Sequence, residues 1–127
     1  MAESQSALPL EFSLRLPAIN DDVNIGELFL VELPARSGPA RPSIIAQVPS
    51  NLPTVLVIPL TSQVESLRFP GTVLIEATPE NGLPQNSIAL VFQLTVVDRR
   101  FMTERIGQLT PEVMTRIWKA LDSLTGR

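Results

Sequence analysis

The sequence contains no cysteine and no histidine. Without cysteine, the chain has neither disulfide bonds nor a thiol nucleophile, a composition that fits a reducing cytosol. Without histidine, it lacks the most common metal ligand and the most common general base. Any chemistry must therefore use carboxylates, arginine, lysine or hydroxyl groups.

Long hydrophobic runs are missing as well. No stretch reaches the roughly 18 consecutive apolar residues of a membrane-spanning helix, and no basic segment precedes an apolar stretch near the N-terminus. We therefore expect a cytoplasmic protein with neither a membrane span nor a signal peptide.

Strong charge of either sign is absent from most of the chain. The formal net charge is −3, and residues 1–25 carry four of the 13 acidic side chains but one of the ten basic ones. The remainder holds as many acidic as basic groups and is neutral. A neutral body has no broad electrostatic footprint, so charge alone neither supports nor excludes RNA as a partner.

Short apolar runs are what the chain does contain. Its 127 residues make about one domain, large enough to bury a core without a metal or disulfide. Runs rich in Val, Ile and Leu, separated by turn residues, predict strands. These strands are expected at residues 10–16, 27–33, 43–48, 54–60, 72–77 and 87–97. Many short strands at close spacing predict a mainly β protein curled into a small barrel, because closing a sheet removes exposed edges.

The last segment changes period and predicts a helix over residues 111–124. Thr110 suits the N-cap, Pro111 the first helical position and Gly126 the end. One stripe at helical spacing is apolar: Val113, Met114, Ile117, Trp118, Leu121 and Leu124. Because Trp118 lies within that stripe, we interpret it as packing the helix onto the barrel or a second subunit rather than stacking on a base. So small a barrel leaves little room for the whole stripe, which favours a dimer.

The strand at 54–60 ends in three polar residues, Thr61, Ser62 and Gln63. From spacing alone this cluster is typical of a turn, and Arg41 is typical of a solvated loop charge.

The order of these pieces resembles the MazF/PemK toxins, also called mRNA interferases. The resemblance covers nearly all of residues 25–124 and rests on "GELFLVEL", Arg41-Pro42 before "SIIAQV", then "VIPLTSQ", "NGLPQNSIALVFQLTVVD" and "IGQLTPEVM". It implies an SH3-like barrel domain at 25–127 with a C-terminal helix, after an N-terminal extension at 1–24. It also implies a homodimer, a cognate antitoxin, and sequence-selective cleavage of single-stranded RNA through the 2′-hydroxyl, with no metal or other cofactor.

The resemblance also implies which residues carry the chemistry. Arg41 matches the catalytic arginine of the family, whose planar fork and pH-independent charge suit phosphate oxygens. Thr61 matches the catalytic threonine, a hydroxyl donor at a strand end facing the same groove. The candidates for substrate binding are Ser62, Gln63, Gln93, Glu27 and Arg99. Glu27 is a possible carboxylate base or else a charge on the strand face, and Arg99 is otherwise a solvated surface charge.

The sequence departs from the family pattern at three places. The loop before Arg41 lacks an acidic residue, and Thr95 and Phe101 stand where the family commonly has arginine. Two alternatives therefore stay open: a catalytically degenerate binding or regulatory subunit, and a CcdB-like poison of a protein target. Retention of Arg41 and Thr61 speaks against the second.

The acidic extension at 1–24 has two interpretations. Its strictly alternating run at 10–16 predicts a half-buried strand that closes the barrel edge. Alternatively, the extension covers the groove or a dimer seam of its own chain by strand addition.

Overall fold

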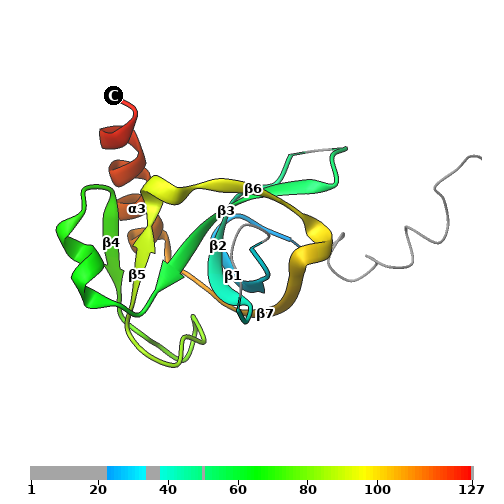
Figure 1. The fold of residues 1–127 in the computed structure, drawn as a ribbon, viewed down its shortest axis with the longest axis horizontal. Helices are drawn as coiled ribbons and strands as arrows, with labels where there is room; N and C mark the ends of the chain where they lie inside the picture. Colours follow the sequence, from blue (N-terminus) through cyan, green and yellow to red (C-terminus); the bar gives the residue numbers. More distant parts are fainter. Residues whose placement is uncertain (1–22, 34–37, 50, 127) are drawn as a thin grey trace, which may run out of the picture.

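The computed structural model describes residues 23–33, 38–49 and 51–126 (Figure 1). The predicted strand at 10–16, and with it both interpretations of the extension, lies outside the described residues. The described elements are β1 (Glu27–Val31), β2 (Arg41–Gln47), β3 (Thr54–Thr61), η1 (Val64–Arg68), β4 (Thr72–Ile75), β5 (Ser87–Leu90), η2 (Val91–Gln93), β6 (Thr95–Asp98), η3 (Arg99–Phe101), β7 (Met102–Gln108) and α3 (Pro111–Leu124), where η denotes a 3₁₀ turn.

Strand β3 is the centre of the sheet. The described strands form one antiparallel sheet in the order β4-β5-β3-β2-β1-β7, with β6 paired to β3 off this path. The first half of β3, at 54–57, pairs with β6, and its last residues, 60–61, pair with β5. Because its two ends serve different partners, the sheet curls around β3 (Figure 1). The predicted mainly β, curled-barrel fold with a C-terminal helix is confirmed for the described part of the chain.

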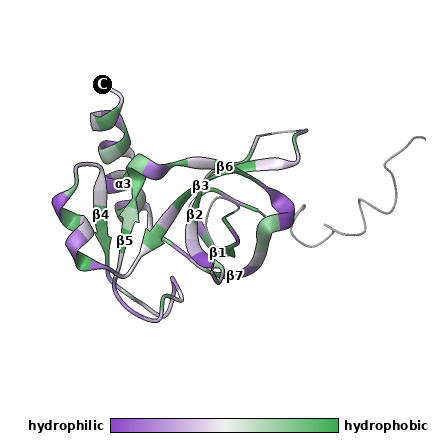
Figure 2. Ribbon diagram, in the orientation of Figure 1, coloured by the Kyte–Doolittle hydropathy of each residue, from purple (hydrophilic) through white to green (hydrophobic). Residues whose placement is uncertain are grey.

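Apolar residues fill both faces of the curled sheet. Neighbouring residues of a strand point to opposite faces, so Ile44 and Ile58 join one buried cluster while Ile45 and Val57 join the other. The first cluster lies beneath α3, and the second includes residues of β1 and β6 and the start of β7. Figure 2 shows hydrophobic residues along the strands, with hydrophilic residues more frequent in the connecting segments.

Helix α3 has the predicted bounds and the predicted start. The Thr110 side chain accepts a hydrogen bond from the Val113 backbone N–H at 3.3 Å, and Pro111 is the first helical residue. Met114 is buried and Trp118 packs partly buried against the core, which supports the packing interpretation of Trp118. The chain buries Met114 by itself, so of the predicted stripe it is Leu124, 39% exposed, that is left open for a second subunit.

The predicted strand at 87–97 is wrong as a single element. Its first part is β5, which pairs with the end of β3, and its last part is β6, which pairs with the beginning of β3. The chain must turn between these partners, and it does so in η2, where the Val91 and Phe92 N–H groups donate to the Gly71 carbonyl. No Gly or Pro marks this turn, because the backbone of another segment accepts its hydrogen bonds.

Candidate active site

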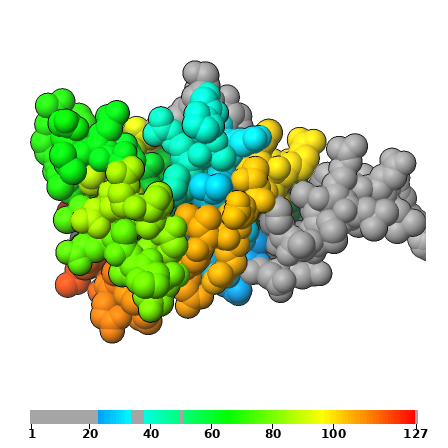
Figure 3. Space-filling model, turned by 90° about the horizontal axis from the view of Figure 1, so that it is seen from below, coloured from blue at the N-terminus to red at the C-terminus, as the bar shows by residue number. Residues whose placement is uncertain are grey.

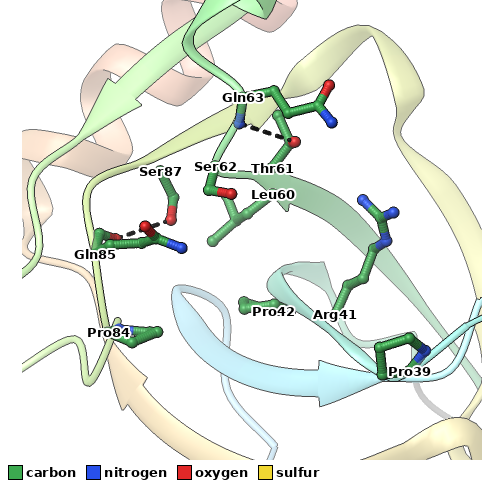
Figure 4. A pocket seen from close by; sticks show the side chains of 10 residues that line it. All are labelled: Pro39, Arg41, Pro42, Leu60, Thr61, Ser62, Gln63, Pro84, Gln85 and Ser87. Carbon is green, nitrogen blue, oxygen red and sulfur yellow. Dashed lines mark hydrogen bonds between the residues drawn. The ribbon is translucent and has the colours of Figure 1, made fainter.

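The ends of β2 and β3 meet at a pocket of about 300 Å³ (Figure 4). In the antiparallel register Ser43 lies opposite Pro59, which brings the first residue of β2 beside the last residue of β3. The segment before β5 forms the other wall. The pocket is lined by Pro39, Arg41, Pro42, Leu60, Thr61, Ser62, Gln63, Pro84, Gln85 and Ser87.

Arg41 supplies the only charge among the described residues that line the pocket. It is partly exposed, and its guanidinium makes no hydrogen bond or ion pair with the part of the chain that the structure describes. Figure 4 shows the side chain extending from β2 towards the wall that Thr61 and Gln63 form. A guanidinium without a carboxylate partner is suited to bind an anion, above all a phosphate with two oxygens in reach of its fork.

A local hydrogen bond fixes the Thr61 hydroxyl. Its Oγ1 accepts from the Gln63 backbone N–H at 3.2 Å, so the polar cluster at the strand end is indeed a turn. Since a hydroxyl has one proton and two lone pairs, an oxygen that accepts from the backbone still has its proton to donate. The turn therefore orients Thr61 as a donor, while the neighbouring Ser62 and Gln63 are exposed at the rim.

The site residues predicted from the sequence did not include the opposite wall of the pocket, which Pro84, Gln85 and Ser87 form. Pro84 and Gln85 are exposed, and the buried Ser87 donates from its hydroxyl to the Gln85 carbonyl at 3.0 Å. The quoted motif "NGLPQNS" spans this wall, but its order along the chain contains no sign that the segment folds back towards β2 and β3.

Glu27 does not line this pocket. It is 7% exposed, and its carboxylate accepts from the Asn24 backbone N–H and from Arg105 Nε, both at 2.7 Å. Arg105 also donates to Gln108. Because both carboxylate oxygens are engaged, Glu27 serves to join β1 and the chain before it to β7.

Gln93 and Arg99 also lie away from the pocket lining. Arg99 is 6% exposed at the start of η3, where its backbone N–H donates to the Pro53 carbonyl at 2.8 Å. Gln93 is partly buried in η2. A buried arginine is not the solvated surface charge that the sequence suggested.

Metal ligands do not gather in the described ranges 23–33, 38–49 and 51–126: no group there has three or more acidic side chains placed to hold an ion. Among the same residues, no helix is both long and apolar enough to cross a membrane.

The described residues form a curled antiparallel barrel, with an arginine that has no partner among them and an oriented hydroxyl at its strand ends. Comparison with known proteins gives the family. The sequence model of the PemK-like, MazF-like toxins of type II toxin-antitoxin systems matches residues 24–125. The chain belongs to this family, and the resemblance read from its motifs is confirmed.

Relatives with assigned activities are endoribonucleases. The chain is 26% identical over 106 residues to endoribonuclease EndoA of Bacillus subtilis, covering 78% of this chain and 90% of that protein. It is 27% identical over 107 residues to endoribonuclease MazF6 of Mycobacterium tuberculosis, covering 78% and 93%. Its fold matches a solved mycobacterial endoribonuclease in complex with its cognate antitoxin, with a TM-score of 0.67 and 18% identity over 83% of this chain and 96% of that one.

Proposed function

We propose that the protein is the toxin of a toxin-antitoxin pair, an endoribonuclease that cuts single-stranded RNA at selected sequences in the pocket between β2, β3 and the segment before β5. The observation that carries the proposal is that Arg41, which has no partner among the described residues, and the Thr61 hydroxyl line the same open pocket. Two relatives of similar length are named endoribonucleases, which supports the same activity here.

The proposed reaction uses the RNA's own 2′-hydroxyl as nucleophile. The 2′-oxygen loses its proton to water and bonds to phosphorus, and the bond from phosphorus to the 5′-oxygen breaks. The leaving oxygen takes up a proton from water, so the products are a 2′,3′-cyclic phosphate and a 5′-hydroxyl end. The Arg41 fork binds two phosphate oxygens, and the Thr61 hydroxyl donates to the charge that builds up on them.

Among the described residues, no group of acidic side chains is placed to hold a metal ion, and the pocket lining contains no carboxylate. Its contribution to the reaction is therefore the stabilisation of negative charge rather than removal of a proton. Fixed donors of this kind need no metal ion, so we expect the cleavage to proceed in EDTA.

The test is incubation of the purified chain with a mixed-sequence single-stranded RNA in EDTA, followed by mapping of the new ends. We expect cuts in RNA and none in DNA, because DNA lacks the 2′-hydroxyl. Arg41→Ala is expected to slow cleavage about 10²- to 10³-fold, the effect of losing one fixed donor. The matched control is Lys119→Ala, which removes a positive charge from the exposed face of α3, outside the pocket.

A non-catalytic subunit of the same family is the second candidate. It is favoured by the single charge of the lining and by Thr95 and Phe101, which stand where the resemblance leads us to expect arginine. Absence of any cut in the EDTA assay, or cutting that Arg41→Ala leaves intact, would favour this candidate over the nuclease.

We also propose that the protein forms a homodimer and that a cognate antitoxin binds this dimer in the inactive state. An exposed apolar surface supports the dimer, and we call it the Phe69 patch; it consists of Val64, Leu67, Phe69, Phe92 and Leu124. The Phe69 and Phe92 ring centroids are 6.1 Å apart. A solved relative in complex with its cognate antitoxin supports the second partner.

A further inference from the structure

The segment between β4 and β5 is held together by one buried amide. Asn81 is 4% exposed, and its Oδ1 accepts from the backbone N–H groups of Thr78 and Leu83, each at 3.0 Å. Its Nδ2 donates to the Glu76 carbonyl at 2.8 Å. A buried amide is costly unless its donors and acceptors are satisfied, and here the backbone of its own segment satisfies them. The segment therefore has one preferred conformation before any ligand binds.

Close contact with β7 fixes the same segment from outside. Gly82 has a φ of +69°, and a Cβ at this position would collide with the Ile106 carbonyl. The Gln108 N–H donates to the Glu80 carbonyl at 3.1 Å. Figure 3 shows the yellow-green surface of this segment beside the orange surface of β7. The segment thus lies against a strand of the sheet rather than projecting into solvent.

A third anchor stands at the start of β5. Asn86 Oδ1 accepts from the Ala77 N–H at 2.8 Å, and the Ser87 hydroxyl donates to the Gln85 carbonyl. Between this anchor and Asn81, the exposed tip is Pro84 and Gln85, and both line the pocket. The fixed φ of proline removes further freedom from the tip.

The Gln85 side chain lies on the pocket wall opposite Arg41 (Figure 4). It is exposed, and none of the side-chain hydrogen bonds within residues 23–33, 38–49 and 51–126 uses its amide. An amide offers two donors and one acceptor group side by side, the pattern that pairs with the edge of a nucleobase. In single-stranded RNA these base edges are open to such contacts.

We propose that Gln85 determines sequence specificity by reading the edge of a base next to the cleaved phosphate, on a wall that Asn81, Asn86 and Gly82 hold in place. This inference rests on the proposed function. With the phosphate at Arg41 and Thr61, the adjoining base lies on the other wall of the pocket, where the Gln85 amide is unpaired. Because the wall is ordered in advance, binding does not spend interaction energy on ordering it.

The experiment compares the unmodified chain with Gln85→Ala and Gln85→Glu on a randomised single-stranded RNA pool, with sequencing of all new ends. We expect Gln85→Ala to cut still, with the preference for one base beside the cut reduced roughly 5- to 150-fold. A carboxylate only accepts hydrogen bonds, so Gln85→Glu should turn the preference towards guanine, whose Watson–Crick edge offers two adjacent donors. The matched controls are Gln47→Ala and Gln47→Glu, which change an exposed glutamine at the far end of β2.

A second measurement keeps the inference testable apart from cleavage. A randomised 2′-O-methyl RNA pool cannot be cut because its nucleophile is blocked, so the sequences retained by immobilised protein report base preference alone. A preference that disappears in Gln85→Ala but not in Gln47→Ala supports the inference even if the chain cuts nothing. Cleavage by Gln85→Ala with an unchanged motif overturns it and leaves the nuclease intact. If the chain cuts nothing and its retention of RNA does not depend on Gln85, both the proposed nuclease function and the inference about Gln85 are overturned.

Discussion

Arg41 and Thr61 differ in how the fold holds them, and this difference sets how each responds to substitution. In the proposed reaction Arg41 acts through its charge and its planar fork, which lysine cannot reproduce, so Arg41→Lys is expected to restore little activity. In the same proposed reaction Thr61 acts through one proton, whose direction depends on the hydrogen bond from the Gln63 N–H. The proposed use of Thr61 as a donor is thus tied to a local bond across three residues.

Thr61→Val is expected to lower the cleavage rate about 10²-fold or more while leaving the melting temperature nearly unchanged. Valine keeps the shape of threonine, and the hydrogen bond that it removes is local and exposed. The assay is cleavage of single-stranded RNA together with a thermal melt. Thr103→Val is the matched control, because Thr103 Oγ1 donates to the Leu30 carbonyl outside the pocket. Equal losses in the two variants would contradict a role specific to Thr61.

Substitution of the buried Glu27 tests whether this carboxylate takes part in the reaction or only stabilises the fold. Because its oxygens accept hydrogen bonds from Asn24 and Arg105, we expect Glu27→Gln to destabilise the fold by about 1.5–3 kcal/mol, the range for hydrogen bonds to a charged group. Urea unfolding measures this loss. Cleavage per folded molecule should stay within a few-fold of the original. A rate loss of roughly 10²- to 10⁴-fold in a folded variant would instead identify Glu27 as the general base.

At the scale of elements, local sequence patterns predicted an element correctly where all the residues that determine it lie within that element. Helix α3 was predicted at its observed bounds, since Thr110, Pro111 and the apolar stripe all belong to the helix. Strand β7 was not predicted, because it lies at the end of the sheet and Thr103, Glu104 and Arg105 are exposed. An edge strand in water need not be apolar.

Arg41 and Thr61 were predicted as site residues only through the family resemblance. The structure adds that the antiparallel pairing of β2 with β3 brings these two strand ends together. The wall with Gln85 depends on contact between the 76–87 segment and β7, two parts of the chain that no periodicity relates. The burial of Arg99 likewise depends on its tertiary surroundings rather than on its neighbours in sequence.

Gly82 lies where the segment between β4 and β5 contacts β7. We expect substitutions of glycine to cost more stability here than at a glycine with open space around it. Alanine at a positive φ costs about 1–2 kcal/mol, and at Gly82 the added Cβ also collides with the Ile106 carbonyl. Gly82→Ala should therefore lose clearly more stability than Gly126→Ala, because Gly126 also has a positive φ but open space around it. Urea unfolding of the two variants gives the comparison. Equal losses would mean that the segment yields to the new methyl group.

At the scale of the whole molecule, the Phe69 patch gathers five of the exposed apolar side chains of the described residues. Val64 is 61% exposed, while Phe69 and Phe92 are 44% and 42% exposed. Exposed apolar side chains in contact with one another, as Phe69 and Phe92 are, are typical of an interface. The Arg68 guanidinium lies over the Phe69 ring, 4.9 Å from its centroid.

Sedimentation should show a dimer at roughly tens of micromolar, the range expected for a micromolar interface. Phe69→Glu is expected to shift the protein to the monomer, because a charge without a partner would be buried between the copies. Val96→Glu is the matched control, since Val96 is 56% exposed on β6 and lies outside the patch. A monomer in the unmodified protein, or equal effects of both substitutions, would contradict a dimer through this surface.

In the segment between β4 and β5, one set of residues holds the backbone and another set faces the pocket. The buried amide of Asn81 belongs to the first set. Its hydrogen bonds hold the segment through backbone groups alone, and backbone groups are the same whichever side chains stand at the tip. Residues 84 and 85 can therefore change during evolution without loss of the scaffold. Related toxins with the same anchors would diverge in target sequence through these two positions, and exchanging the two residues between relatives would be a compact way to reprogram the cut.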